Sequence, residues 1–184
     1  MPWYHYSSNS LNEKLYNVNQ QKNINGKPCG FWLSYNNEWL DWCKSQEFYT
    51  CNPDNYYRYE YSLDKLNLYK IYSVEELRAF QDKYAVQDKY TARIDWEKVA
   101  TKYDGVIFLN YSKIKNDLMS NASMEMLYSA LNCMDINDME SQIKMKKSYF
   151  DYMWFTMIDI SCACIWNTDN LEIIGEVKFR WGTF

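Results

Sequence analysis

The stretch GFWLSYNNEWLDWC, residues 30–43, decides the prediction of the fold. The apolar run after the glycine has high β propensity and predicts a strand over residues 30–34. The second half places apolar residues at helical spacing, which predicts a short helix within residues 37–48. A strand that leads directly into an aromatic helix is therefore the local unit around which the rest of the chain is arranged.

Outside this stretch, aromatic residues that alternate with polar ones predict half-buried strands, and Ser73 with Glu76 forms a capping box that begins a helix. Asp95 is a second predicted N-cap. The predicted strands cover residues 2–7, 56–62, 66–72, 106–109, 154–166 and 171–181, and the predicted helices cover residues 74–84, 94–100 and 113–149. Six or seven strands with three or four helices, in no regular alternation, indicate a mixed α+β fold.

We expect a single domain over residues 1–184, because 184 residues and 22.3 kDa suit one hydrophobic core. No repeat, charged block or linker rich in Pro and Gly divides the chain. A composition with 18% aromatic residues, 5 Gly and 3 Pro argues against disorder. Within the domain, residues 113–150 are predicted to form a helical insertion or a recognition element.

The charge disfavours a protein that binds nucleic acid non-specifically. The formal net charge is −4 and the pI is near 5.1, whereas such binding needs a basic face. No apolar run reaches the roughly 18 residues of a membrane span, and no signal peptide is recognisable at the N-terminus. We therefore expect a cytoplasmic protein with reduced thiols, in the host cytoplasm if the source is viral. One His and no Cys-x-x-Cys pair predict no metal site.

Two features of the sequence could carry chemistry. The only histidine, His5, lies in the first predicted strand and could be a general base, a ligand or a structural hydrogen-bonding residue. Trp32, Trp39 and Trp42 fall within eleven residues and could form either part of the core or a stacking wall for a flat ring. The chain has no Gly-x-Ser-x-Gly elbow and no Gly-rich phosphate loop, which argues against serine hydrolases, kinases, P-loop NTPases and Rossmann dehydrogenases.

The chain has a predicted strand that carries His, then a loop, then a Gly-Phe-Trp-Leu-Ser strand that leads into an aromatic helix. In this order of elements it resembles ADP-ribosyltransferases of the diphtheria-toxin and poly-ADP-ribose-polymerase type. The resemblance is specific over residues 4–7 and 28–43 and loose over residues 154–181. It implies a split mixed β-sheet core with peripheral helices, and NAD as the cofactor. The whole chain is also similar to small phage-borne proteins with a His-Tyr-Ser start.

The resemblance implies a role for each matching residue. His5 would bind the NAD ribose, the backbone of Tyr6 would hold the nicotinamide amide, and Trp32 and Trp42 would sandwich the ring. Ser34 takes the place of a small hydroxyl residue. The full set of predicted NAD-binding residues is Tyr6, Ser7, Trp32, Ser34, Trp39 and Trp42.

The catalytic acid of that family has no direct counterpart in this sequence. Alignment of the final strand pair by its turn places Cys162 at the position of the acid, and the nearest carboxylate is Asp159. An ionisable residue in a predicted inner strand is costly to bury unless it is paired or functional. We therefore predict that His5 and Asp159 are catalytic, with Asp159 stabilising a cationic transition state. Glu172 and Glu176 are predicted to face solvent.

The leading hypothesis is an NAD-dependent mono-ADP-ribosyltransferase-like protein that modifies a host protein or nucleic acid and acts inside a cell. The missing late-strand acid supports an alternative, a catalytically inactive protein of the same fold that binds or inhibits a host factor. A third interpretation is an aromatic-lined module for sugars or nucleotides.

Overall fold

Seven strands form one mixed sheet in the order β4-β7-β8-β2-β1-β3-β9. The computed structural model describes residues 2–11, 15–20, 26–48, 56–87, 92–120 and 151–179. The sheet consists of β1 (Trp3–Ser7), β2 (Phe31–Tyr35), β3 (Tyr56–Ser62), β4 (Leu68–Ile71), β7 (Gly105–Phe108), β8 (Cys162–Ile165) and β9 (Glu172–Phe179). Only β4 and β7 pair in parallel, and every other neighbouring pair in the sheet is antiparallel. The predicted mixed α+β fold with a large sheet is confirmed.

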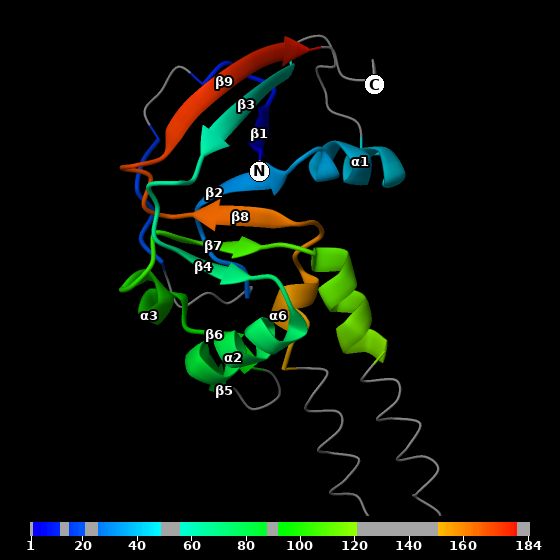
Figure 1. The fold of residues 1–184 in the computed structure, drawn as a ribbon, viewed down its shortest axis with the longest axis vertical. Coiled ribbons are helices and arrows are strands. Elements are labelled where there is room, and N and C mark those ends of the chain that lie inside the picture. Colours follow the sequence, from blue (N-terminus) through cyan, green and yellow to red (C-terminus); the bar gives the residue numbers. More distant parts are fainter. Residues whose placement is uncertain are drawn as a thin grey trace, which may run out of the picture.

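The sheet divides between β1 and β2. These strands pair through two residue pairs, Trp3 with Tyr35 and Tyr4 with Ser34, whereas β1 pairs with β3 through five. Beyond Tyr4 the two strands diverge, so β9, β3 and β1 form one group and β2, β8, β7 and β4 form the other (Figure 1).

Two hydrophobic cores lie on opposite faces of the sheet. In the first, α2 (Val74–Tyr84), α3 (Trp96–Ala100) and α6 (Met153–Thr156) pack against β7 and β8 through large aromatic residues such as Phe80, Trp96 and Phe155. In the second, the opposite face of β2, β7 and β8 packs against side chains of β1 and β3, among them Trp3 and Tyr59. The sheet therefore folds over on itself, and both groups of strands are fixed by burial.

The helix boundaries follow from side-chain caps that the sequence predicted. Ser73 Oγ accepts a hydrogen bond from the Glu76 amide at 3.2 Å, and α2 covers the predicted residues. The Glu76 carboxylate reaches back to the amide of Tyr72 at 2.6 Å. Asp95 caps α3 by accepting from the Lys98 amide at 3.0 Å. These caps satisfy amides that a helix leaves free in its first turn.

Two local predictions need correction, and one hairpin was not predicted. Residues 154–166 were predicted as one strand, but Trp154 and Phe155 belong to the short helix α6 and the strand begins only at Cys162. The antiparallel hairpin of β5 (Ala85–Gln87) and β6 (Ala92–Ile94) was not predicted, and Ile94 ends a strand where the sequence suggested a helix. The described part of the chain therefore contains nine strands.

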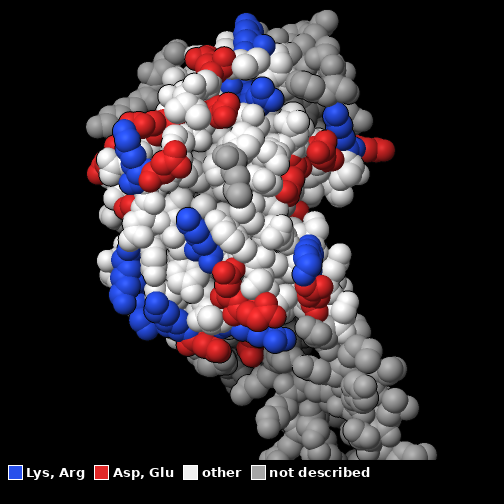
Figure 2. Space-filling model, in the orientation of Figure 1, with Lys and Arg blue, Asp and Glu red and all other residues white. Residues whose placement is uncertain are grey.

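The predicted helical insertion is described only at its start. Residues 111–120 are helical, as expected for the first part of that segment, and residues 121–150 lie outside the described residues. Within the described ranges, no helix is both long enough and apolar enough to cross a bilayer. Acidic and basic side chains are interspersed over the visible face of the molecule, without a continuous basic surface (Figure 2).

Candidate functional site

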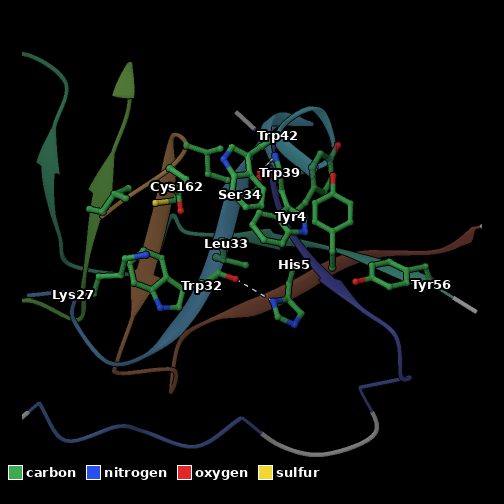
Figure 3. A pocket seen from close by; sticks show the side chains of 14 residues that line it. Tyr4, His5, Lys27, Trp32, Leu33, Ser34, Trp39, Trp42, Tyr56 and Cys162 are labelled. Atoms are coloured by element: carbon green, nitrogen blue, oxygen red, sulfur yellow. Dashed lines mark hydrogen bonds between the residues drawn. The ribbon is translucent and has the colours of Figure 1, made fainter. Parts of the chain in front are cut away.

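A cavity of about 410 Å³ lies beside the divergence of β1 and β2. The helix α1 (Glu38–Ser45) and the loop before β8 close it on two further sides (Figure 3). Seven of the eight residues predicted from the sequence line it: His5, Tyr6, Trp32, Ser34, Trp39, Trp42 and Asp159. These residues come from four separate segments, so the fold has brought them together.

His5 lies where the two strands separate. Its Nδ1 atom is 3.1 Å from the carbonyl oxygen of Trp32, and its ring packs on Phe31 with centroids 4.3 Å apart. Because a carbonyl only accepts hydrogen bonds, Nδ1 carries the proton in this contact and Nε2 is left as an acceptor. Burial lowers the pKa of His5, and the hydrogen bond to Trp32 only partly opposes this effect. His5 is therefore uncharged at neutral pH and can accept a hydrogen bond from a hydroxyl group.

The aromatic residues line the cavity on two sides. Trp39 and Trp42 stack on each other in α1, with centroids 5.1 Å apart and planes inclined by 13°. Trp32 lies away from this pair across the cavity (Figure 3), and no ring contact joins it to either indole within the described residues. The predicted sandwich by Trp32 and Trp42 is thus open, and the faces of the two residues are not in contact.

Ser34 is buried and fixes the beginning of α1. Its Oγ accepts a hydrogen bond from the amide of Trp39 at 3.0 Å, and its hydroxyl lies 3.4 Å from the carbonyl of Tyr35. The hydroxyl therefore positions the indole of Trp39 through the backbone. Ser7, the eighth predicted residue, does not line the cavity, and its Oγ accepts from the Asn9 amide at 3.1 Å at the end of β1.

Tyr4 and Tyr6 form the β1 side of the cavity. The guanidinium of Arg58 lies 4.5 Å from the ring centroid of Tyr4, a distance typical of a cation–π contact. Burial raises the pKa of Tyr6 to about 12, so its hydroxyl stays protonated at neutral pH. The Tyr6 hydroxyl lies 3.5 Å from the carbonyl oxygen of Asn36 and from Asn37 Oδ1, so this side of the cavity contributes chiefly aromatic side chains.

Asp159 does not lie in an inner strand as predicted. It is an exposed residue of the loop between α6 and β8, and its flanking residues Ile158 and Ile160 also line the cavity. Cys162, which the predicted alignment set in place of a catalytic acid, is buried, and burial raises the pKa of its thiol well above the usual value. Cys162 is therefore a neutral thiol, and Asp159 supplies the carboxylate at this wall.

The loop that carries Asp159 is held by Glu38, which sequence reasoning did not select. Glu38 Oε2 accepts a hydrogen bond from the amide of Ser161 at 2.7 Å, and the carbonyl of Ser161 accepts from the amide of Tyr35 at 3.0 Å. An acid in the first turn of a helix is common for electrostatic reasons, so its position alone gave no signal of this contact.

Lys27 was also not selected from the sequence. It is half-buried and lines the cavity beside Trp32 (Figure 3). Its positive charge lowers the pKa of the Cys162 thiol, which opposes the larger increase caused by burial. Only the tertiary structure places this residue, because the segment before β2 has the composition of an exposed loop.

A second cavity of about 430 Å³ adjoins the first. Trp42, Asp159 and Ile160 line both, so the two share a wall. The second cavity is also lined by Glu38 and Asp41, and by Lys113, whose ammonium pairs with Asp117 at 2.9 Å. Its lining therefore carries more negative than positive charge.

No protein-family model matches the chain, and searches of curated proteins and of solved structures found no significant similarity. Within the described ranges, no three residues of the types His, Cys, Asp and Glu are grouped so that they could hold a metal ion.

Proposed function

We propose that the protein is an NAD-dependent mono-ADP-ribosyltransferase-like enzyme that uses the cavity between β1, β2, α1 and the loop before β8. One observation carries this proposal. Seven residues that the sequence singled out for NAD binding or catalysis, from positions 5 to 159, line a single cavity. A resemblance without structural meaning would not be expected to select residues that meet at one site.

The size and chemistry of the cavity suit a nucleotide. A volume of about 410 Å³ falls within the usual range for small-molecule sites, about 300–1,000 Å³. Aromatic faces on opposite walls can stack on a flat heterocycle, and a few polar groups can fix its orientation. His5 Nε2, as a free acceptor, can bind a ribose hydroxyl, as the resemblance implies for this histidine.

NAD would supply a ribose whose bond to nicotinamide breaks with the electron pair leaving on nicotinamide, so that positive charge develops on the ribose. In this proposal the Asp159 carboxylate stabilises that charge, and His5 and the indoles hold the ring and the ribose in place. A nucleophile of the acceptor then bonds to the ribose carbon and releases its proton. Because Asp159 is exposed, water screens its charge until a ligand or an acceptor covers it.

We favour a protein side chain over nucleic acid as the acceptor. The second cavity shares Asp159 and Trp42 with the proposed NAD site, and Glu38 and Asp41 add further negative charge there. Carboxylates repel a phosphate backbone, which basic residues must neutralise in a nucleic-acid site. In a lysate incubated with the protein and labelled NAD, we therefore expect protease, and not nuclease, to release the label from the modified macromolecules.

The exposed position of Asp159 and the neutral thiol at Cys162 favour one rival function, an inactive protein of the same fold that binds a partner. The two functions differ in turnover. The enzyme releases nicotinamide from NAD and transfers label to an acceptor, and Asp159→Asn abolishes both reactions while NAD still binds. If the protein is inactive, neither the wild type nor Asp159→Asn releases nicotinamide or transfers label.

Calorimetric titration with NAD tests the binding site itself. Trp32→Ala should weaken NAD binding at least about fivefold, because stacking on a base contributes about 1–3 kcal/mol. Tyr16→Ala is the control, since Tyr16 is an aromatic residue that is 76% exposed and lines neither cavity. Absence of measurable NAD binding to the wild-type protein would refute the proposed function.

A further inference from the structure

We propose that Lys27 binds a phosphate group of the ligand, so that the cavity selects a nucleotide that carries phosphate over the corresponding nucleoside. The proposal rests on the proposed function, because it takes NAD as the ligand and the diphosphate as the group that Lys27 contacts. It adds a specificity-determining residue that the sequence did not reveal.

The first argument is the charge of the cavity wall. Among the described residues that line the cavity, Lys27 and Asp159 are the formally charged ones, since His5 is uncharged at neutral pH. Lys27 forms no ion pair within the described part of the chain, whereas Lys65 and Lys113 each pair with a carboxylate. Lys27 is half-buried as a residue, and the oxygens of a bound phosphate would give its ammonium an anionic partner and acceptors for its donors.

The second argument is the fixed backbone on both sides of Lys27. Gly26 has φ +81°, and a Cβ there would lie 3.0 Å from the Cβ of Trp154. The carbonyl of Gly26 accepts from the indole of Trp96 at 2.9 Å, and the amide of Cys29 donates to Gln20 Oε1 at 3.0 Å. The backbone of the loop is therefore packed against the first core, which holds Lys27 at the wall of the cavity.

The third argument comes from the proposed reaction. Positive charge develops on the ribose when nicotinamide leaves, and a nearby uncompensated ammonium would oppose it. Lys27, Asp159 and Cys162 all line the same cavity. With the diphosphate bound to Lys27, the lysine charge is compensated and no longer opposes the positive charge on the ribose, which the carboxylate of Asp159 stabilises.

A structural role would give a different pattern from a phosphate contact. The aliphatic part of a lysine can simply cover an aromatic face, here that of Trp32, with the ammonium in water. Lys27→Met retains that aliphatic contact and removes the charge. Lys102→Met, at an exposed position that lines neither cavity, is the matched control.

The experiment is calorimetric titration of the wild type and of both variants with NAD and with nicotinamide riboside, which has the same nicotinamide and ribose but no phosphate. We expect Lys27→Met to bind NAD about 10–100-fold more weakly, with the binding of nicotinamide riboside changed less than twofold. Lys102→Met should match the wild type for both compounds. The difference between wild type and Lys27→Met should also shrink at high salt, because screening weakens the charge interaction.

If Lys27→Met loses affinity equally for NAD and nicotinamide riboside, the proposal is overturned in favour of a packing role. Unchanged affinity of Lys27→Met for NAD would also overturn it. In both cases the wild type still binds NAD, and the proposed function stands. If the wild type binds neither compound, the proposed function itself fails. Thermal unfolding of each variant shows whether the fold is retained.

Discussion

Glu38 gives the most direct structural prediction, because a single charged hydrogen bond joins α1 to the loop that carries Asp159. Glu38 Oε2 accepts from the Ser161 amide at 2.7 Å, and Ser161 is 3% exposed. Glu38→Ala removes the acceptor and leaves the buried amide without its partner. Loss of a hydrogen bond to a charged group costs about 1.5–3 kcal/mol, to which an unsatisfied buried donor adds its desolvation.

The assay is urea unfolding followed by circular dichroism, with Glu38→Gln as the matched variant. The glutamine carbonyl can still accept from the Ser161 amide, so this variant should lose about 1 kcal/mol or less. For a chain of this length, the loss in Glu38→Ala corresponds to a melting temperature lower by about 3–12 °C. A loss below about 0.5 kcal/mol in Glu38→Ala, or equal losses in both variants, would refute the role of this contact.

Two further predictions concern His5 and Gly30. Burial lowers the pKa of His5 from 6.5 in the folded protein, so the unfolded chain binds more protons as the pH falls through 6.5. The free energy of unfolding of the wild type, relative to that of His5→Asn, should therefore decrease as the pH falls through 6.5. A constant difference from about pH 5 to 8 would contradict the buried neutral state. Gly30→Ala places a Cβ 2.5 Å from a carbonyl oxygen of β8 and should lower the free energy of unfolding by about 1–3 kcal/mol. In Gly175→Ala the new Cβ meets nothing closer than 3.5 Å, so this variant should lose far less. Equal losses in the two glycine variants would show that β2 and β8 separate readily.

Local patterns in the sequence predicted much of the fold. The capping box at Ser73 and the N-cap at Asp95 fixed the beginnings of α2 and α3, because these contacts join residues three positions apart. The alternating residues of β3 predicted its bounds, Tyr56–Ser62, for the same reason. Such signals depend on neighbours in the chain, so a single sequence contains them.

Residues whose roles depend on distant partners were harder to predict. Trp154 and Phe155 have high β propensity, but burial against Phe80 and Phe108 holds them in the short helix α6. As a result Asp159 lies in an exposed loop and not in an inner strand. The β propensity of a residue gives no information on its packing against distant side chains.

The candidate site shows the same division. His5 and the indoles, which short sequence motifs singled out, line the cavity. Glu38 could not be predicted, because it contacts Ser161 more than 100 residues away. Lys27 could not either, because its place follows from the packing of the preceding Gly26 against the distant Trp154. The separation of β1 from β2 after Tyr4, which makes the cavity, likewise follows from the packing of whole strands.

The central claim is that the cavity between β1, β2 and α1 is an NAD site, and a crystal structure of the protein soaked with NAD tests it most directly. The account predicts the nicotinamide ring between Trp32 and the stacked indoles of α1, with a ribose hydroxyl within hydrogen-bonding distance of His5 Nε2. NAD bound elsewhere on the molecule, or no bound NAD at saturating concentration with the cavity unobstructed, would contradict it.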